Sequence, residues 1–191
     1  MPGLTNESDS AYVHKMILII DTTSQKIKLA TENKVAEIEC EKQSIELPAA
    51  VQNFIDNDFK QLSAIGVVVG PGSFTGIRIG IAYATGLSIG LGIPVVPINQ
   101  FEIYLEKSPD AFVAIDSGKL DCFVASAHHA PQVMDIDTVE TEQMKCAQTV
   151  GHAPYDLADA LPIVRRKLNL NEPVIPMYLK NHYADKSCQS S

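Results

Sequence analysis

The fold is decided by residues 65–80, which read Ile-Gly-Val-Val-Val-Gly-Pro-Gly-Ser-Phe-Thr-Gly-Ile-Arg-Ile-Gly. The apolar run at 65–69 does not alternate with polar residues, which predicts a strand buried on both faces. Gly70-Pro71-Gly72-Ser73 then predicts a sharp turn, and a helix is expected from about Phe74 to Leu91. A strand, a glycine-rich turn and a helix N-terminus in this order are typical of an α/β protein.

Two functions of that turn remain open from the pattern alone. Backbone N–H groups at the start of a helix can bind an anion such as a phosphate. The turn is not a Walker A loop, because no lysine follows the second glycine, and Gly70, Gly72 and Gly76 lack the spacing of a dinucleotide fingerprint. The alternative is a structural turn in which Ser73 or Thr75 caps the helix.

Strands and helices are expected on both sides of this stretch. A buried strand at 16–20 precedes the polar residues Asp21-Thr22-Thr23-Ser24, and an alternating antiparallel hairpin follows it. The further expected elements are hairpin strands at 26–30 and 34–40, a helix at about 46–59, a strand at 94–97, a helix at 99–106, and strands at 111–115 and 121–127. Residues 131–150 are acidic and show no clear pattern, and four prolines break the tail.

The sequence contains one short pattern that occurs twice. Residues 16–24 and 111–118 each give an apolar strand, an aspartate and then small polar residues. Two such units predict a duplicated α/β architecture of the actin and sugar-kinase type, in which each half opens with a hairpin aimed at phosphate. Asp21, Thr22, Asp116 and Ser117 are therefore candidates for cofactor binding, against the common alternative that they cap strand ends.

The expected domains are a first lobe at 16–107 and a smaller second lobe at 108–191. Residues 1–15 are polar and precede a second methionine, so we expect a leader or a disordered tail there.

Composition narrows the class of protein. The 191 residues carry a formal net charge of −8, which makes the chain a poor RNA binder on its own because nucleic-acid affinity comes mainly from cations. The four cysteines form no CxxC pair, which favours reduced thiols in a cytoplasmic protein. Every apolar run is interrupted before about 18 residues, so no membrane span is expected.

The helix expected after the glycine-rich turn is unusual. Gly76, Gly80, Ala84 and Ser88 form one row of small residues at a spacing of four. A second row comprises Ala82, Gly86 and Gly90, and Arg78 is the only charged residue from 74 to 91. Glycine inside a helix costs up to about 1 kcal/mol relative to alanine, so these glycines favour close approach of a neighbouring helix. The helix is either a central core helix or one with a face that binds another protein.

Candidate catalytic groups are few. His128 and His129 are adjacent after a strand and face opposite sides, while Pro154 separates His152 from Asp156. The basic cluster at 165–167 is explained by a solvated helix face. Serine, cysteine and histidine show no nucleophile-elbow or dyad spacing, so neither a catalytic nor a metal site is predicted.

Four segments resemble the TsaB family, also called YeaZ. They are MILIIDTTS at 16–24, VVVGPGSFTGIRIG at 67–80, AYATGLSIGLGIPVV at 82–96 and IDSGKLDCFVA at 115–125, and PMYLK at 176–180 is similar to the closing segment of the family. The resemblance implies a two-lobe actin-like (ASKHA, ribonuclease-H-like) fold with a reduced second lobe. It also implies a role in making threonylcarbamoyladenosine, the modified adenosine beside the anticodon of certain tRNAs.

The resemblance further implies that the chain is a non-catalytic scaffold or activator. Such a subunit forms a heterodimer with the transferase TsaD, is joined by the ATPase TsaE, and meets tRNA only within the complex, which uses ATP that the isolated chain does not bind. Helices at about 46–59 and 74–91 are the implied pairing surface. Its implied residues are Leu47, Val51, Phe54, Ser73, Phe74, Thr75, Gly76, Ile77, Arg78, Gly80, Tyr83, Ala84 and Leu87.

Two alternatives to the scaffold reading stay open. In the first, the chain is a stand-alone small-molecule kinase or a metallopeptidase of the same superfold. In the second, it forms a homodimer through the same helix, because a two-fold interface uses one patch twice.

Overall fold

The computed structural model describes residues 16–118, 120–145, 148–151 and 153–180. The leader expected at 1–15, Cys146, His152 and Cys188 lie outside the described residues. Cys40 and Cys122 are free thiols.

The first sheet has five strands in the order β3-β2-β1-β4-β5. Strand β1 (Met16–Asp21) pairs in parallel with β4 (Leu62–Val68), and β4 pairs in parallel with β5 (Val95–Ile98). The expected hairpin is confirmed as the antiparallel strands β2 (Lys26–Ala30) and β3 (Val35–Glu39). Because β1 and β4 lie in the middle of the sheet and are covered on both faces, their sequences are nearly uniformly apolar.

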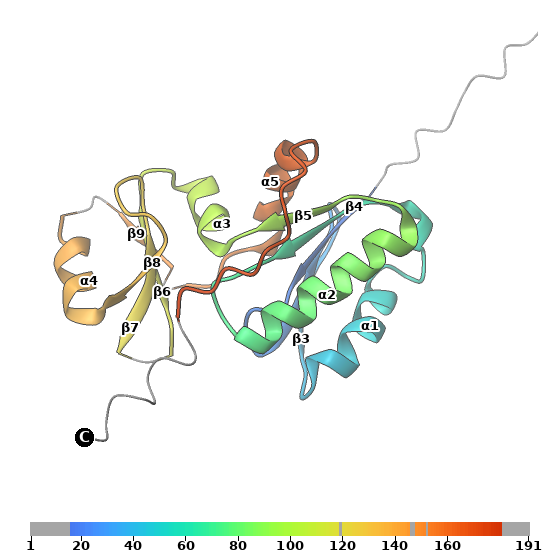
Figure 1. Cartoon of the computed structure of the whole chain (residues 1–191), viewed down its shortest axis with the longest axis horizontal. Helices are drawn as coiled ribbons and strands as arrows, with labels where there is room; N and C mark the ends of the chain where they lie inside the picture. Colours follow the sequence, from blue (N-terminus) through green and yellow to red (C-terminus); the bar gives the residue numbers. More distant parts are fainter. Residues whose placement is uncertain (1–15, 119, 146–147, 152, 181–191) are drawn as a thin grey trace, which may run out of the picture.

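Helices cover both faces of this sheet (Figure 1). Helices α1 (Gln43–Phe54) and α2 (Phe74–Leu91) pack on one face, where Leu18, Ile20 and Val67 are buried. On the other face, α5 (Ala160–Lys167) packs against β5 and β4, beside α3 (Gln100–Lys107) and the 3₁₀ turn η2 (Leu157–Asp159).

The second, smaller sheet has the order β8-β7-β6-β9. Strands β6 (Phe112–Asp116), β7 (Asp121–Ala125) and β8 (Gln132–Asp135) form an antiparallel meander, and β9 (Thr149–Val150) pairs in parallel with β6. Helix α4 (Ile136–Gln143) lies beside this sheet, at the left of Figure 1. The described residues of the stretch 131–150, in which the sequence showed no pattern, therefore form three short elements.

Helix α1 lies three to five residues earlier than the predicted 46–59. It begins at Gln43, where the Glu46 carboxylate accepts hydrogen bonds from the backbone N–H groups of Lys42 (2.8 Å) and Glu41 (2.9 Å). The helix ends at Phe54 because Asp56 and Asn57 adopt positive φ, which a continuing helix excludes. Residues 59–61 form a separate 3₁₀ turn, η1 (Phe59–Gln61).

The end of the chain returns to the first sheet. The predicted boundary assigned all of 108–191 to the second lobe, but Ile163 and Val164 of α5 are fully buried against the first sheet. The basic cluster of α5 also differs from expectation. Lys167 is not a solvated residue, because its ammonium donates to Glu102 (2.7 Å) and to the carbonyl of Pro97 (3.1 Å) and forms an ion pair with Glu172 (2.9 Å).

Residues 172–180, which we call the strap, run in extended form from α5 back past both sheets (Figure 1). The Met177 N–H donates to the Val69 carbonyl at 2.7 Å, just beyond the end of β4. Met177 packs against the cores of both lobes, and Leu179 packs against the second. The strap therefore ties the two lobes together.

Candidate functional site

The turn between the antiparallel strands β1 and β2, which we call the first hairpin, is filled by groups of the chain itself. The corresponding turn between β6 and β7 is the second hairpin. Asp21 is only 1% exposed. Its Oδ1 accepts hydrogen bonds from the Thr23 N–H (2.8 Å) and hydroxyl (2.6 Å), and its Oδ2 accepts one from the Tyr155 hydroxyl (2.5 Å). Burial and the Asp21 charge raise the pKa of Tyr155 well above its usual value, so this phenol remains a neutral donor. Asp21 thus acts as an acceptor that holds distant segments together.

Replacing Tyr155 by phenylalanine is expected to lower the free energy of unfolding by about 1–3 kcal/mol, because a buried carboxylate would lose one donor. The measurement is urea denaturation at neutral pH. Tyr104→Phe is the matched control, since the Tyr104 hydroxyl donates to the exposed carbonyl of Ala153 and its loss should cost less. Equal urea midpoints for the two variants would contradict this role of Tyr155.

The glycine-rich turn before α2 is packed tightly against the first hairpin. Ser73 caps the helix by accepting a hydrogen bond from the Gly76 N–H, as predicted, and the Ser73 N–H donates to the Thr23 carbonyl at 2.7 Å. Gly72 has a φ of 146°, and a Cβ there would lie 2.4 Å from the backbone carbonyl oxygen of Thr23. The Gln100 amide fixes the turn by donating to the Thr23 hydroxyl (2.7 Å) and to the Pro71 carbonyl (2.6 Å).

Gly76 and Gly80, the first two members of the first row of small residues in α2, pack against that same hairpin. The Thr22 hydroxyl donates to the Gly76 carbonyl at 2.7 Å. A Cβ on Gly76 would lie 1.9 Å from the Thr22 carbonyl oxygen, and one on Gly80 would lie 2.4 Å from the Thr22 hydroxyl oxygen. The spacing of these glycines predicted close approach of a neighbouring helix. The structure corrects this expectation, because a turn of the same chain approaches them.

The second hairpin is held by the strap. Asp116 accepts a hydrogen bond from the Gly118 N–H at 2.8 Å, as in an ordinary strand-end turn. The Lys180 ammonium donates to the Ser117 hydroxyl (2.6 Å) and to the Asp121 carboxylate (2.5 Å). The two hairpins thus have different partners late in the chain, Tyr155 for the first and Lys180 for the second.

The opposite face of α2 carries the second row of small residues, and it is solvent-exposed. A Cβ on Gly86 or Gly90 would meet no described part of the chain within 4 Å, and Ile89 is 78% exposed. We call this surface the open α2 face, and it comprises Thr75, Arg78, Ala82, Gly86, Ile89 and Gly90. Figure 1 shows α2 on the outside of the first lobe.

The composition of α2 makes its exposure notable. The helix has a mean hydropathy of 1.2, yet only 22% of its residues are fully buried within the chain, and the others are half-buried or exposed. By length and composition alone it is able to cross a membrane, which differs from the expectation based on uninterrupted apolar runs. Core helices of soluble proteins satisfy the same criterion, and one face of α2 packs on the first sheet. The helix therefore has one face covered by its own sheet and one face that is apolar and uncovered.

The predicted pairing residues divide between these two faces. Ser73, Thr75 and Arg78 are exposed, and Phe74, Tyr83 and Leu87 are half-buried. The remaining predicted residues lie in the core of this chain, beneath the surface, and they are Leu47, Val51, Phe54, Gly76, Ile77, Gly80 and Ala84. The open α2 face also contains the exposed residues Ala82, Gly86, Ile89 and Gly90, which are not among the predicted pairing residues, although the second row of small residues includes three of them.

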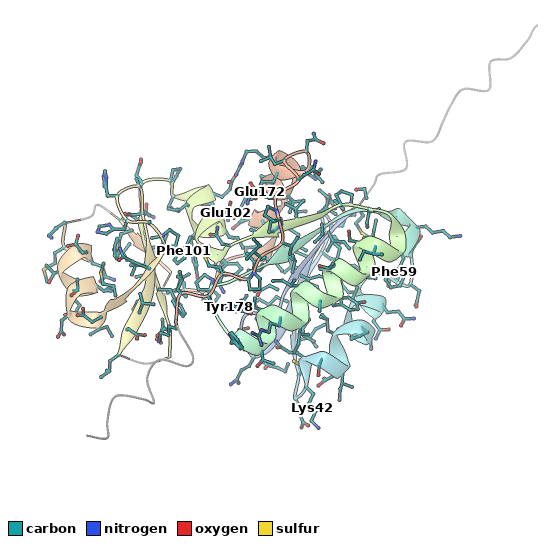
Figure 2. All side chains as sticks on the ribbon, in the orientation of Figure 1. Lys42, Phe59, Phe101, Glu102, Glu172 and Tyr178 are labelled. Carbon is teal, nitrogen blue, oxygen red and sulfur yellow. The ribbon has the colours of Figure 1, made fainter. Side chains whose placement is uncertain are left out.

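Arg78 is held in place by two aromatic rings. Its guanidinium carbon lies 3.7 Å from the centroid of Phe74, and its Nε donates to the Tyr178 hydroxyl at 2.8 Å. The two rings themselves lie 4.6 Å apart. Tyr178, which Figure 2 labels beside the N-terminal end of α2, comes from the strap, 100 residues later in the sequence.

Two further features lie near these elements. A groove of about 460 Å³ runs between α1 and β3, with Ile38, Ala50 and Phe54 among its lining residues. Within the described part of the chain, no group of three His, Cys, Asp or Glu side chains is arranged to hold a metal ion.

Comparison with known proteins assigns the family. The family model for TsaD, tRNA N6-adenosine threonylcarbamoyltransferase, matches residues 34–168. The chain belongs to this family. Two solved structures from Pseudomonas aeruginosa share its fold, one described as YeaZ and the other as an uncharacterized protein with similarity to peptidase YEAZ. Their TM-scores are 0.65 and 0.67 at 18% identity, and they cover 86% and 87% of this chain and 100% of their own. The predicted actin-like, ribonuclease-H-like fold is thereby confirmed.

The curated relatives include TsaB proteins, which confirms the resemblance found in the sequence. The TsaB of Buchnera aphidicola subsp. Acyrthosiphon pisum is 36% identical over 74 residues, which are 36% of this chain and 34% of the relative. The Escherichia coli K12 TsaB is 32% identical over 91 residues, 44% of this chain and 39% of the relative. A Chlorobium limicola tRNA N6-adenosine threonylcarbamoyltransferase is 36% identical over 45 residues, 24% of this chain and 13% of the relative. The chain spans less than half the length of each of these relatives.

Proposed function

We propose that this chain is a non-catalytic subunit in tRNA threonylcarbamoyladenosine biosynthesis and that it pairs with the transferase TsaD in the cytoplasm. The observation that carries the proposal is the open α2 face, a largely apolar helix surface with two glycines against which no described residue of the chain packs. Exposed helix glycines cost stability, which is explained if they let a partner helix approach closely.

Membership of the TsaD family supports TsaD as the partner. Two proteins with a common fold carry corresponding helices, so they can pair about an approximate two-fold axis using equivalent patches. The family match at 34–168 includes all of α1 and α2. A second copy of this chain would use the same patch, so a homodimer would compete with the heterodimer.

The charge of the chain supports a division of work within the complex. With a net charge of −8, the chain is poorly suited to contact the tRNA phosphates, and this contact is assigned to its partners. The first hairpin also favours a non-catalytic role, because Thr23 and Tyr155 of the chain itself supply the hydrogen-bond donors to the Asp21 carboxylate. We assign ATP use to the complex with TsaE and none to the isolated chain.

The test is reconstitution of threonylcarbamoyl transfer to tRNA with the chain alone, with TsaD and TsaE alone, and with all three together. We expect no modified adenosine from the chain alone and a large increase when it is added to TsaD and TsaE. Modification by the chain alone would contradict the non-catalytic assignment. An unchanged yield after its addition would contradict the activating role.

A further inference from the structure

We propose that Arg78 is a preorganised anchor that binds a carboxylate on the partner helix seated against the open α2 face. This inference rests on the proposed function and goes beyond it, because it specifies the chemistry that the partner must present. The occupant is an apolar, small-residue helix surface carrying one aspartate or glutamate beside the N-terminal end of α2.

The first support is the fixed position of the guanidinium. It stacks on Phe74 at 3.7 Å, and its Nε is bonded to the Tyr178 hydroxyl. Tyr178 is in turn positioned by the strap, since the adjacent Met177 is bonded to the Val69 carbonyl. A surface arginine normally loses much side-chain entropy on forming an ion pair, and this one is already ordered.

The second support is the donor capacity that these contacts leave. They occupy only Nε, and no hydrogen bond or ion pair joins the two terminal NH₂ groups to any residue that the structure describes. A guanidinium with both terminal groups open binds a carboxylate through two parallel hydrogen bonds. The side chain is exposed on the same side of α2 as Ala82 and Gly86, so a docked helix would cover it.

The third support is the charge of the surface. Arg78 is the only charged residue in the 18 residues of α2, and the chain as a whole is acidic. A partner that covered Arg78 without a carboxylate would bury an unpaired cation, which is strongly unfavourable. Arg78 would therefore select the register and the identity of the partner, as buried charges at interfaces do.

The experiment measures the affinity of the full chain for TsaD by calorimetry, over a range of salt concentrations. Arg78→Gln is expected to weaken binding roughly 30-fold or more and to flatten the salt dependence. Arg78→Lys should retain part of the affinity, because it keeps the charge and loses the two-pronged geometry. Tyr178→Phe should cause a smaller loss by freeing the guanidinium. Arg166→Gln, on α5, removes an exposed arginine on the other face of the sheet and should leave affinity within about twofold.

The outcomes separate this inference from the proposed function. No binding by the unmodified chain overturns the pairing itself. Normal binding by the unmodified chain and equal binding by Arg78→Gln overturn the anchor and leave the pairing intact. A loss in Arg78→Gln without any change in salt dependence overturns the carboxylate assignment, because packing would then explain the loss. Urea midpoints of all variants, measured in parallel, exclude unfolding as the cause.

Discussion

Gly76→Ala is expected to cost about 3 kcal/mol or more of folding stability and to leave the chain largely unfolded. The added Cβ would sit 1.9 Å from the carbonyl oxygen of Thr22, a backbone atom that cannot turn away as a side chain does. Thr22 is itself held, because its hydroxyl is bonded to the Gly76 carbonyl and its residue is fully buried. The measurement is urea denaturation followed by far-ultraviolet circular dichroism.

The control for Gly76→Ala is the same substitution ten residues later, at Gly86. No residue that the structure describes lies within 4 Å of a Cβ at that position, so Gly86→Ala should raise the stability of the isolated chain by roughly 0.5–1 kcal/mol. A gain in stability from both substitutions would contradict the close packing of Gly76 against Thr22.

Gly86→Trp is expected to weaken pairing with TsaD by about 100-fold or more while leaving the chain folded. The indole would stand in the centre of the open α2 face and hold a partner helix away from the glycine row. Gly86 is exposed and no described residue lies within 4 Å of a Cβ there, so the urea midpoint should stay close to that of the unmodified protein. Affinity for TsaD is the measured quantity, with circular dichroism as the check on folding.

Thr141→Trp is the control for Gly86→Trp. It places the same side chain at an exposed helical position on α4, in the second lobe. This variant should bind TsaD normally. Tight binding by Gly86→Trp would show that the partner docks elsewhere, whereas equal losses in both variants would show a general effect of an exposed tryptophan.

The contrast between Gly76 and Gly86 shows which contacts of α2 cannot be predicted from the sequence. Both rows of small residues in α2 have the same spacing, so a helical projection cannot tell which one faces the sheet. The choice is made by contacts between Thr22 and Gly76, 54 residues apart. Tyr155 and Tyr178, which complete the first hairpin and the Arg78 site, are still more distant in the sequence and carry no local signal for these roles.

Local signals explain which elements were predicted well. The strand, turn and helix at 62–91 were predicted closely, because an uninterrupted apolar run meets glycine, proline and a serine cap. Helix α1 was misplaced because its end depends on positive φ at Asp56 and Asn57, and its start is stabilised by Glu46 in place of an N-cap side chain. The elements at 131–150 were missed because they are short and contribute few buried apolar residues, chiefly Val139.

The central claim is that the open α2 face binds TsaD, and its most direct test is size-exclusion chromatography with light scattering. The chain is analysed alone, mixed with the TsaD of the same organism, and as Gly86→Trp in the same mixture. We predict a heterodimer that forms at the expense of any homodimer and that the variant fails to form. A mixture that elutes as two separate proteins, with or without ATP and TsaE, would contradict the account.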